Sequence, residues 1–153
     1  MVERRSGGLK ARIDTSARLL LDFLERNKKD GSFDYPHSFS YPKNCCESVS
    51  LILTYMVEEK YRLDNVRIIK GTKPGTAQHH LWVTVGDRHY DLTAHQFAPR
   101  EPIIGVLADE LFLSVFADWE VELSRDFVDR DTVVALHRAG ATARGAGASG
   151  GTS

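Results

Sequence analysis

Apolar residues recur at helical spacing near the start of the chain. In residues 14–25, Leu20, Phe23 and Leu24 lie three and four residues apart, which is typical of a helix with one buried face. We expect the Asp30–Gly31 pair to end this helix, because glycine readily takes the backbone conformation that stops a helix.

The segment 44–60 predicts a second helix. Asn44 is a favourable N-cap residue, and Glu47, three residues later, has the spacing to reach back to the N–H of the cap. Leucine and methionine follow, and charged residues close the segment, so composition and spacing agree on a helix.

Strict alternation later in the chain predicts a β-hairpin. Residues 79–85 and 89–93 form its two strands around a turn at residues 86–88, and residues 65–70 form a strand before them. In the first hairpin strand the two alternating sets are Leu81, Val83 and Val85, and His80, Trp82 and Thr84.

The remaining segments have weaker patterns. Residues 32–43 and 71–78 predict loops, residues 103–113 are mixed, and a last strand falls within residues 113–123, before a short helix over residues 131–138. Helices followed by strands predict an α+β fold in which N-terminal helices pack on an antiparallel sheet. We expect a flexible N-terminus (1–8), one domain (9–138) and a disordered tail rich in Gly, Ala and Ser (139–153).

Composition narrows the classes of function. A length of 153 residues suits a single domain, and 42% hydrophobic with 27% charged residues is typical of a globular protein. The formal net charge of −1 argues against nucleic-acid binding through bulk electrostatics. No apolar stretch approaches the roughly 18–20 residues that cross a bilayer. The two cysteines are neighbours that cannot link distant segments, so we expect a cytoplasmic protein.

Cys45 and Cys46 stand at the start of the second predicted helix. The unpaired N–H groups at a helix start stabilise a thiolate, which is the nucleophilic form of cysteine. Cys45 lies four residues before Val49 on the apolar face, whereas Cys46 lies nearer the edge of that face. We therefore prefer Cys46 as the nucleophile, although burial of both as small apolar residues is the common alternative.

The predicted hairpin supplies the partners that a thiol nucleophile needs. If two or four residues connect the strands, Trp82 pairs with Asp91, and Asp91 shares a face with His80. A three-residue connection without a bulge would remove this arrangement. His79 points to the other face. Each of these residues can also have a purely structural role: His80 as an ordinary strand residue, Asp91 as the residue that ends a strand, and Trp82 as a packing residue.

A zinc site formed by both cysteines and both histidines is disfavoured because adjacent ligands cannot easily converge on one ion.

These motifs, in this order, resemble the transglutaminase-like branch of the papain-like cysteine protease superfamily. The matching residues lie between Tyr41 and Phe97: NCCES, His80-Leu81-Trp82, and Tyr90-Asp91-Leu92-Thr93, whose extension DLTAHQF is similar to the ending found in small bacterial members. The match also places the nucleophile at Cys46. Two features depart from transglutaminases proper, since Glu47 follows the cysteine where they have an aromatic residue, and the chain is too short for accessory domains or calcium sites.

The resemblance implies a thiol hydrolase or acyltransferase that acts on a peptide or glutamine-type amide through a Cys46–His80–Asp91 triad. We expect Trp82 and Tyr41 to bind substrate and Gln96, or the backbone N–H of Cys46, to stabilise the oxyanion, with no cofactor or metal. The partner would be a peptide, protein or small amide rather than nucleic acid or a membrane. A glutamine deamidase and a catalytically silent protein-binding module of the same fold are the alternatives, and the sequence leaves the oligomeric state open.

Overall fold

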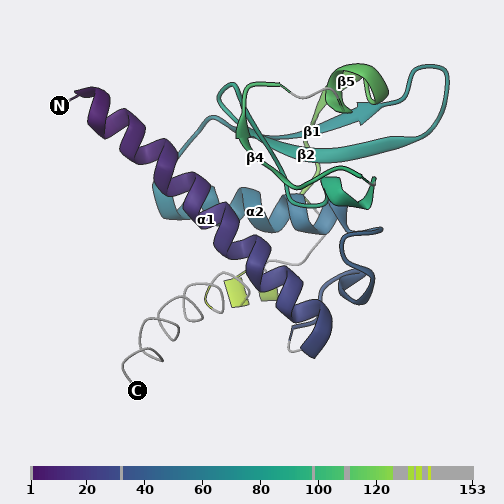
Figure 1. Cartoon of the computed structure of the whole chain (residues 1–153), viewed down its shortest axis with the longest axis horizontal. Coiled ribbons are helices and arrows are strands. Elements are labelled where there is room, and N and C mark those ends of the chain that lie inside the picture. Colours follow the sequence, from purple (N-terminus) through teal and green to yellow (C-terminus); the bar gives the residue numbers. More distant parts are fainter. Residues whose placement is uncertain are drawn as a thin grey trace.

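The computed structural model describes residues 2–31, 33–97, 99–108 and 111–125, and near the end of the chain residues 131, 132, 134, 135 and 138. Within these ranges two helices pack against a five-stranded antiparallel sheet, which confirms the predicted α+β class (Figure 1). The described residues within the helix predicted over residues 131–138 (131, 132, 134, 135 and 138) are helical. Residues 133, 136 and 137, and all of the tail predicted over residues 139–153, lie outside the described residues.

Helix α1 (Val2–Asp30) presents an apolar stripe to the rest of the molecule. Its buried residues follow helical spacing through Ala17, Leu20 and Leu24. The helix ends where the sequence predicts, because Gly31 takes a positive φ of 66° and its N–H donates to a carbonyl one turn back at 2.7 Å.

The start of α1 lies well before residue 14, the first position of the predicted helix. Residues 2–8 continue the helix, although their polar sequence with a glycine pair predicts a flexible terminus. Once a packed apolar stripe has nucleated a helix, each further residue gains one backbone hydrogen bond while only its own backbone dihedral angles are fixed. Extension of the helix therefore costs little free energy. The predicted flexibility of this segment stays a prediction.

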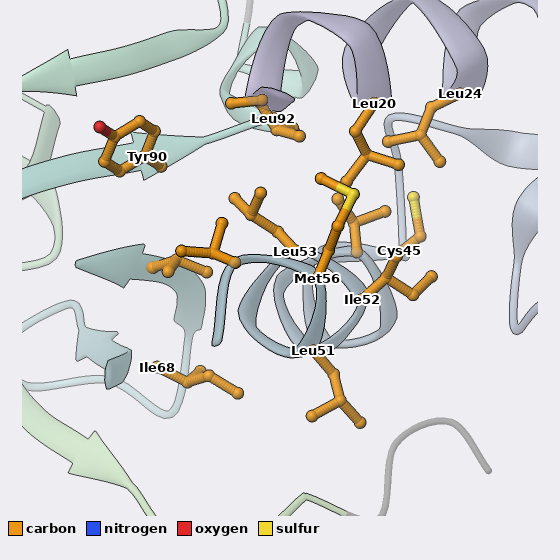
Figure 2. Packing of buried hydrophobic residues seen from close by; sticks show 14 of the residues in the cluster. Leu20, Leu24, Cys45, Leu51, Ile52, Leu53, Met56, Ile68, Tyr90 and Leu92 are labelled. Carbon is orange, nitrogen blue, oxygen red and sulfur yellow. The ribbon is translucent and has the colours of Figure 1, made fainter. Parts of the chain in front are cut away.

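Helix α2 (Cys46–Tyr61) is enclosed by the other elements. Figure 2 shows α2 almost end-on, with Leu20 and Leu24 of α1 pointing toward it from one side and Ile68 of the sheet lying on another. Residues 51–53 are consecutive and each is no more than 1% exposed. A helix that is buried around its whole circumference occupies the centre of a core.

The sheet has the strand order β4-β3-β2-β1-β5, and every neighbouring pair is antiparallel. β2 coincides with the first strand of the predicted hairpin, and β3 overlaps the second. The strands are β1 (Val66–Thr72), β2 (His79–Val85), β3 (Arg88–Asp91), β4 (Ile103–Val106) and β5 (Asp118–Glu122).

Side chains alternate across β2 as the sequence predicts. Leu81 and Val83 join the main core with the helices. Trp82 points to the opposite face and belongs to a second, smaller core. The sheet is therefore covered on both faces around β2.

A segment after β4 forms the cover of this second core. It contains the π-helical turn η3 (Leu111–Val115) and Phe116, and the ring of Phe112 stacks on Trp82 with centroids 4.2 Å apart. Trp82, Phe112 and Phe116 are each 0% exposed. This aromatic layer closes the face of the sheet that the helices leave open.

Strand β4 is not predicted by the sequence, which shows only a mixed pattern over residues 103–113. β4 is a short edge strand, and its pairing with β3 is irregular between His89 and Tyr90. Gly105, with a positive φ of 70°, is the residue between the two partners of this irregular pair, as in a β-bulge. A bulged four-residue strand has too little alternation to be recognised from sequence.

Neither helix in the described ranges combines enough length and apolar character to pass through a lipid bilayer.

We predict that Gly71→Ala lowers the free energy of unfolding by about 1–3 kcal/mol, as overpacking of a core does. A Cβ at this position would lie 2.5 Å from the ring of Trp82 and 2.8 Å from the Cβ of Phe116, and neither of these fully buried residues has room to move. Urea unfolding followed by fluorescence measures the change. Gly8→Ala is the matched control: no atom lies within 4 Å of its Cβ, and alanine should stabilise α1 by about 0.5–1 kcal/mol. Equal stability of Gly71→Ala and the unsubstituted protein would contradict the tight packing.

Candidate functional site

The start of α2 lies one to two residues later than the sequence predicts. Cys45 is the N-cap residue and Cys46 the first helical residue, whereas Asn44, the predicted N-cap, takes a left-handed conformation with a φ of 64°. No side chain caps the helix, so the predicted capping box with Glu47 is wrong. Cys46 nevertheless stands in the first turn, where unsatisfied N–H groups create a partial positive charge that stabilises a thiolate.

The two cysteines have different surroundings, as the sequence predicts. Cys45 is 1% exposed and belongs to the main core, and Figure 2 shows its side chain among the apolar residues around α2. Burial and the neighbouring charge of Cys46 raise the pKa of the Cys45 thiol to about 12. Cys46 is only partly buried and lines a pocket. Cys46 is therefore the thiol that a substrate can reach.

The β2–β3 hairpin brings His80 and Asp91 together. Val85 pairs with Arg88 across a two-residue turn, the register in which His80 and Asp91 share a face. The Nε2–H of His80 donates to Oδ2 of Asp91 at 2.6 Å, and each side chain is 1% exposed. A short hydrogen bond between two buried groups of opposite charge holds the ring in one orientation.

Thr93 holds the carboxylate of Asp91 from the other side. Oδ1 of Asp91 accepts hydrogen bonds from the backbone N–H of Thr93 at 3.0 Å and from its hydroxyl at 3.1 Å. The Tyr41 hydroxyl donates to the carbonyl of Leu92 at 2.5 Å and so anchors the residue between them. The Asp-x-Thr motif thus has a physical purpose, which is to orient the carboxylate toward His80.

His80 sits among aromatic rings and beside the thiol. Its ring centroid lies 5.0 Å from that of Phe97 and 5.5 Å from that of Phe116. Burial alone would lower the pKa of His80, but the charge and hydrogen bond of Asp91, together with a hydrogen bond to Cys46, raise it well above its ordinary value. Since Nε2 is held by Asp91, Nδ1 is the ring nitrogen that faces the thiol. This arrangement favours the protonated imidazolium form of His80.

Four segments enclose a pocket of about 380 Å³ at this point. They are the loop before α2, the first turn of α2, the start of β2 with the residue before it, and the 3₁₀ turn η2 (Ala94–Gln96) with the residue that follows. The lining residues are His37, Asn44, Cys46, Glu47, Gln78, His79, His80, Gln96 and Phe97.

Gln96 lies in this pocket with Cys46 and His80, so the predicted oxyanion donor is near the proposed nucleophile. Its side-chain Nε2 donates to the hydroxyl of Thr93 at 3.4 Å, a long contact that leaves the amide able to turn toward a ligand. The sequence singles out Gln96 only through the AHQF extension of the motif.

Trp82 and Tyr41, the two predicted substrate-binding residues, do not line the pocket. Both are 0% exposed. Trp82 donates from Nε1 to Nδ1 of His89 at 3.0 Å, and Tyr41 holds the backbone after Asp91. The prediction of direct substrate contact by these two residues is wrong, because both act as supports beneath the site.

The pocket also contains residues that the sequence pattern did not single out as site residues. Phe97 is the last residue of the matched extension, and His37 and Asn44 come from the loop before α2. Gln78 and His79 come from the β1–β2 connection and the start of β2. Their positions depend on how three separate loops meet, which a one-dimensional pattern does not contain.

Other chemistry in the described part of the chain is limited. No group of three or more His, Cys, Asp or Glu side chains there could hold a metal ion. A larger hollow of about 670 Å³ lies at α1 and β4, lined by Arg18, residues 99–104 and Val106, and it shares no lining residue with the Cys46 pocket. Cys46 and His80 both line the smaller pocket.

We predict that Asp91→Asn lowers the pKa of His80 by about 1–3 pH units, because it removes the charge that outweighs burial. At mildly alkaline pH the His80 ring should be protonated in the unsubstituted protein and neutral in the variant. Two-dimensional NMR of the histidine ring ¹H–¹³C signals follows both titrations.

Asp87→Asn is the matched control for this titration. It makes the same chemical change in the turn of the same hairpin, where the Asp87 side chain is 81% exposed, and should leave the His80 titration unaltered. A His80 titration that is the same in Asp91→Asn and the unsubstituted protein would show that Asp91 does not govern the ring.

Comparisons of the chain with known family models, with curated proteins and with solved structures found no match.

Proposed function

We propose that the chain is a cysteine-dependent hydrolase or acyltransferase that acts on an amide, with Cys46 as nucleophile, His80 as general acid and base, and Asp91 as the group that orients His80. The observation that carries this proposal is the buried 2.6 Å contact of His80 with Asp91 beside the pocket that Cys46 lines. A thiol gains most from a histidine that a carboxylate holds in place.

The reaction begins when the thiolate of Cys46 attacks the carbonyl carbon of the amide. A C–S bond forms and the carbonyl electron pair moves to the oxygen. Collapse of this intermediate breaks the C–N bond while His80 gives its proton to the leaving nitrogen, which departs as an amine or as ammonia. Water or an amine then attacks the thioester, His80 accepts its proton, and the product acid or amide leaves with regeneration of the thiolate.

The oxyanion formed in the first step requires donors in the same pocket. The backbone N–H of Cys46, at the start of α2, is one candidate, and the side-chain amide of Gln96 is the other. Both stand beside the nucleophile, so they are suited to the charge that develops on the carbonyl oxygen.

Membership in the transglutaminase-like branch is the finer form of this proposal. Two observations support it: the order of Cys46, His80 and Asp91 along the chain, and the placement of the cysteine at a helix start with histidine and aspartate on adjacent antiparallel strands. Glutamine deamidation is the same chemistry with ammonia as the leaving group. A silent binding module remains the alternative from another class, and labelling of Cys46 separates it from an enzyme.

We predict that Cys46 reacts with iodoacetamide at mildly acidic pH, where an ordinary free thiol is almost fully protonated. Cys46→Ala should abolish the labelling, and His80→Gln should slow it at least tenfold because the imidazolium no longer stabilises the thiolate. Mass spectrometry of the intact protein measures the rate.

Cys45→Ala is the matched control, since it removes the neighbouring buried thiol and should keep the fast labelling. The proposal fails if Cys46 reacts no faster than a free thiol. Incubation with a peptide mixture and hydroxylamine then tests turnover, because an acyl-enzyme on Cys46 would be released as a hydroxamate.

We predict that Gln96→Ala lowers the rate of hydroxamate formation by about 10²–10³, the usual effect of losing one oxyanion donor. Alkylation by iodoacetamide develops no oxyanion, so its rate should not change. Gln78→Ala deletes another amide side chain of the pocket and should mainly raise KM. Equal loss of alkylation and turnover in Gln96→Ala would assign Gln96 a structural role instead.

A further inference from the structure

Glu47 places a negative charge directly after the proposed nucleophile. Its side chain is exposed and lines the pocket with Cys46. Among the described residues, no hydrogen bond or ion pair engages this carboxylate, and it does not cap the helix. Glu47 is therefore free to bind a ligand that enters the pocket.

The charges around the Cys46 sulfur decide which ligands the pocket favours. The imidazolium of His80 is balanced by Asp91, which leaves the carboxylate of Glu47 as a negative charge, joined by the Cys46 thiolate of the proposed mechanism. The helix start contributes only about half a positive charge, and neither lysine nor arginine stands among the described residues that line the pocket. The balance is negative, so the pocket attracts cations and repels carboxylates.

A second hollow adjoins the first and has the same character. It has a volume of about 370 Å³ and shares His37 with the Cys46 pocket. Its described lining contains Asp34 and the largely exposed ring of Phe39, but no lysine or arginine. Two adjoining hollows, each within the range of a small-ligand site, provide room for a substrate longer than one residue.

We propose that the substrate is a peptide with a lysine or arginine side chain next to the scissile amide, and that Glu47 is the specificity-determining residue that binds this cation. The inference rests on the proposed function, because it assigns a substrate class to the same site. A carboxylate and an ammonium or guanidinium group form a charge-assisted hydrogen bond that a neutral side chain cannot replace.

The first experiment measures the electrostatic potential at Cys46 and needs no catalytic turnover. Two methanethiosulfonate reagents of similar size, one cationic (the trimethylammonium ethyl form) and one anionic (the sulfonatoethyl form), modify Cys46 in the full chain. In each case the thiolate attacks the reagent sulfur, a disulfide forms, and methanesulfinate leaves. We expect the cationic reagent to react faster, and Glu47→Gln to reduce the ratio of the two rates by about three- to tenfold, as loss of one nearby charge should.

Glu59→Gln is the matched control for this ratio. It makes the same change on the same helix, 13 residues after Cys46 and therefore about 20 Å along the axis, which is more than twice the screening length of roughly 8 Å at physiological salt. It should leave the ratio unchanged. Equal rates for the two reagents in the unsubstituted protein would overturn the inference and leave the proposed nucleophile intact.

The second experiment tests the substrate class. Peptide libraries that are identical except for lysine, norleucine or glutamate at one position are incubated with the protein and hydroxylamine, and the hydroxamates are identified by mass spectrometry. We expect products with lysine next to the reacting carbonyl to exceed those with glutamate at least tenfold, and Glu47→Lys to reverse this order. Products without a charge preference would overturn the inference alone, whereas fast alkylation of Cys46 with no hydroxamate from any library would overturn the proposed function.

Discussion

The site depends on the two-residue turn at Gly86 and Asp87, because this turn sets the register of β2 against β3. With Val85 opposite Arg88, His80 and Asp91 project from the same face of adjacent strands and meet at 2.6 Å. A shift of one residue would turn one of them to the other side of the sheet. The hairpin is central in the sheet, with β1 and β4 on its two sides, so neighbouring strands hold the register on both edges. Catalytic geometry on a rigid central hairpin is more precise than geometry on a loop.

A buried histidine and aspartate are costly to desolvate, and the surroundings show how this cost is offset. Each oxygen of Asp91 accepts at least one hydrogen bond, from His80 on one side and Thr93 on the other. The aromatic layer over the outer face of the sheet excludes water from the pair, which strengthens their attraction because the local dielectric is low. Only the side of the His80 ring that faces Cys46 is left accessible to a reacting group. The second core thus supports the proposed site as well as the fold.

The sequence predicts those elements whose pattern is local. About ten residues of sequence are enough to show each of them: the apolar stripe of α1, the alternation of β2 and the two-residue turn. The last two predict that His80 and Asp91 lie on the same face of the sheet. The start of α2 is misplaced because Asn44 favours two roles, an N-cap and a left-handed turn, and only the surrounding loop decides between them. Trp82 is misassigned because an aromatic residue on the catalytic face can line a groove or lie beneath a cover, and the cover comes from Phe112 and Phe116, some 30 residues later in the chain. Strand β4 is not predicted from the sequence because the bulge at Gly105 interrupts the alternation of its apolar and polar residues.

The burial of Cys45 has a consequence for oxidative chemistry. A peroxide that converts the Cys46 sulfur to a sulfenic acid usually meets a resolving thiol in proteins that survive such oxidation, and the resulting disulfide protects the sulfur from irreversible steps. The other cysteine of this chain is the adjacent residue, yet its sulfur is fixed in the core and its high pKa keeps it protonated. Recovery of an oxidised Cys46 therefore depends on a small thiol or a reductase from outside, which must reach the sulfur through the pocket that Cys46 lines.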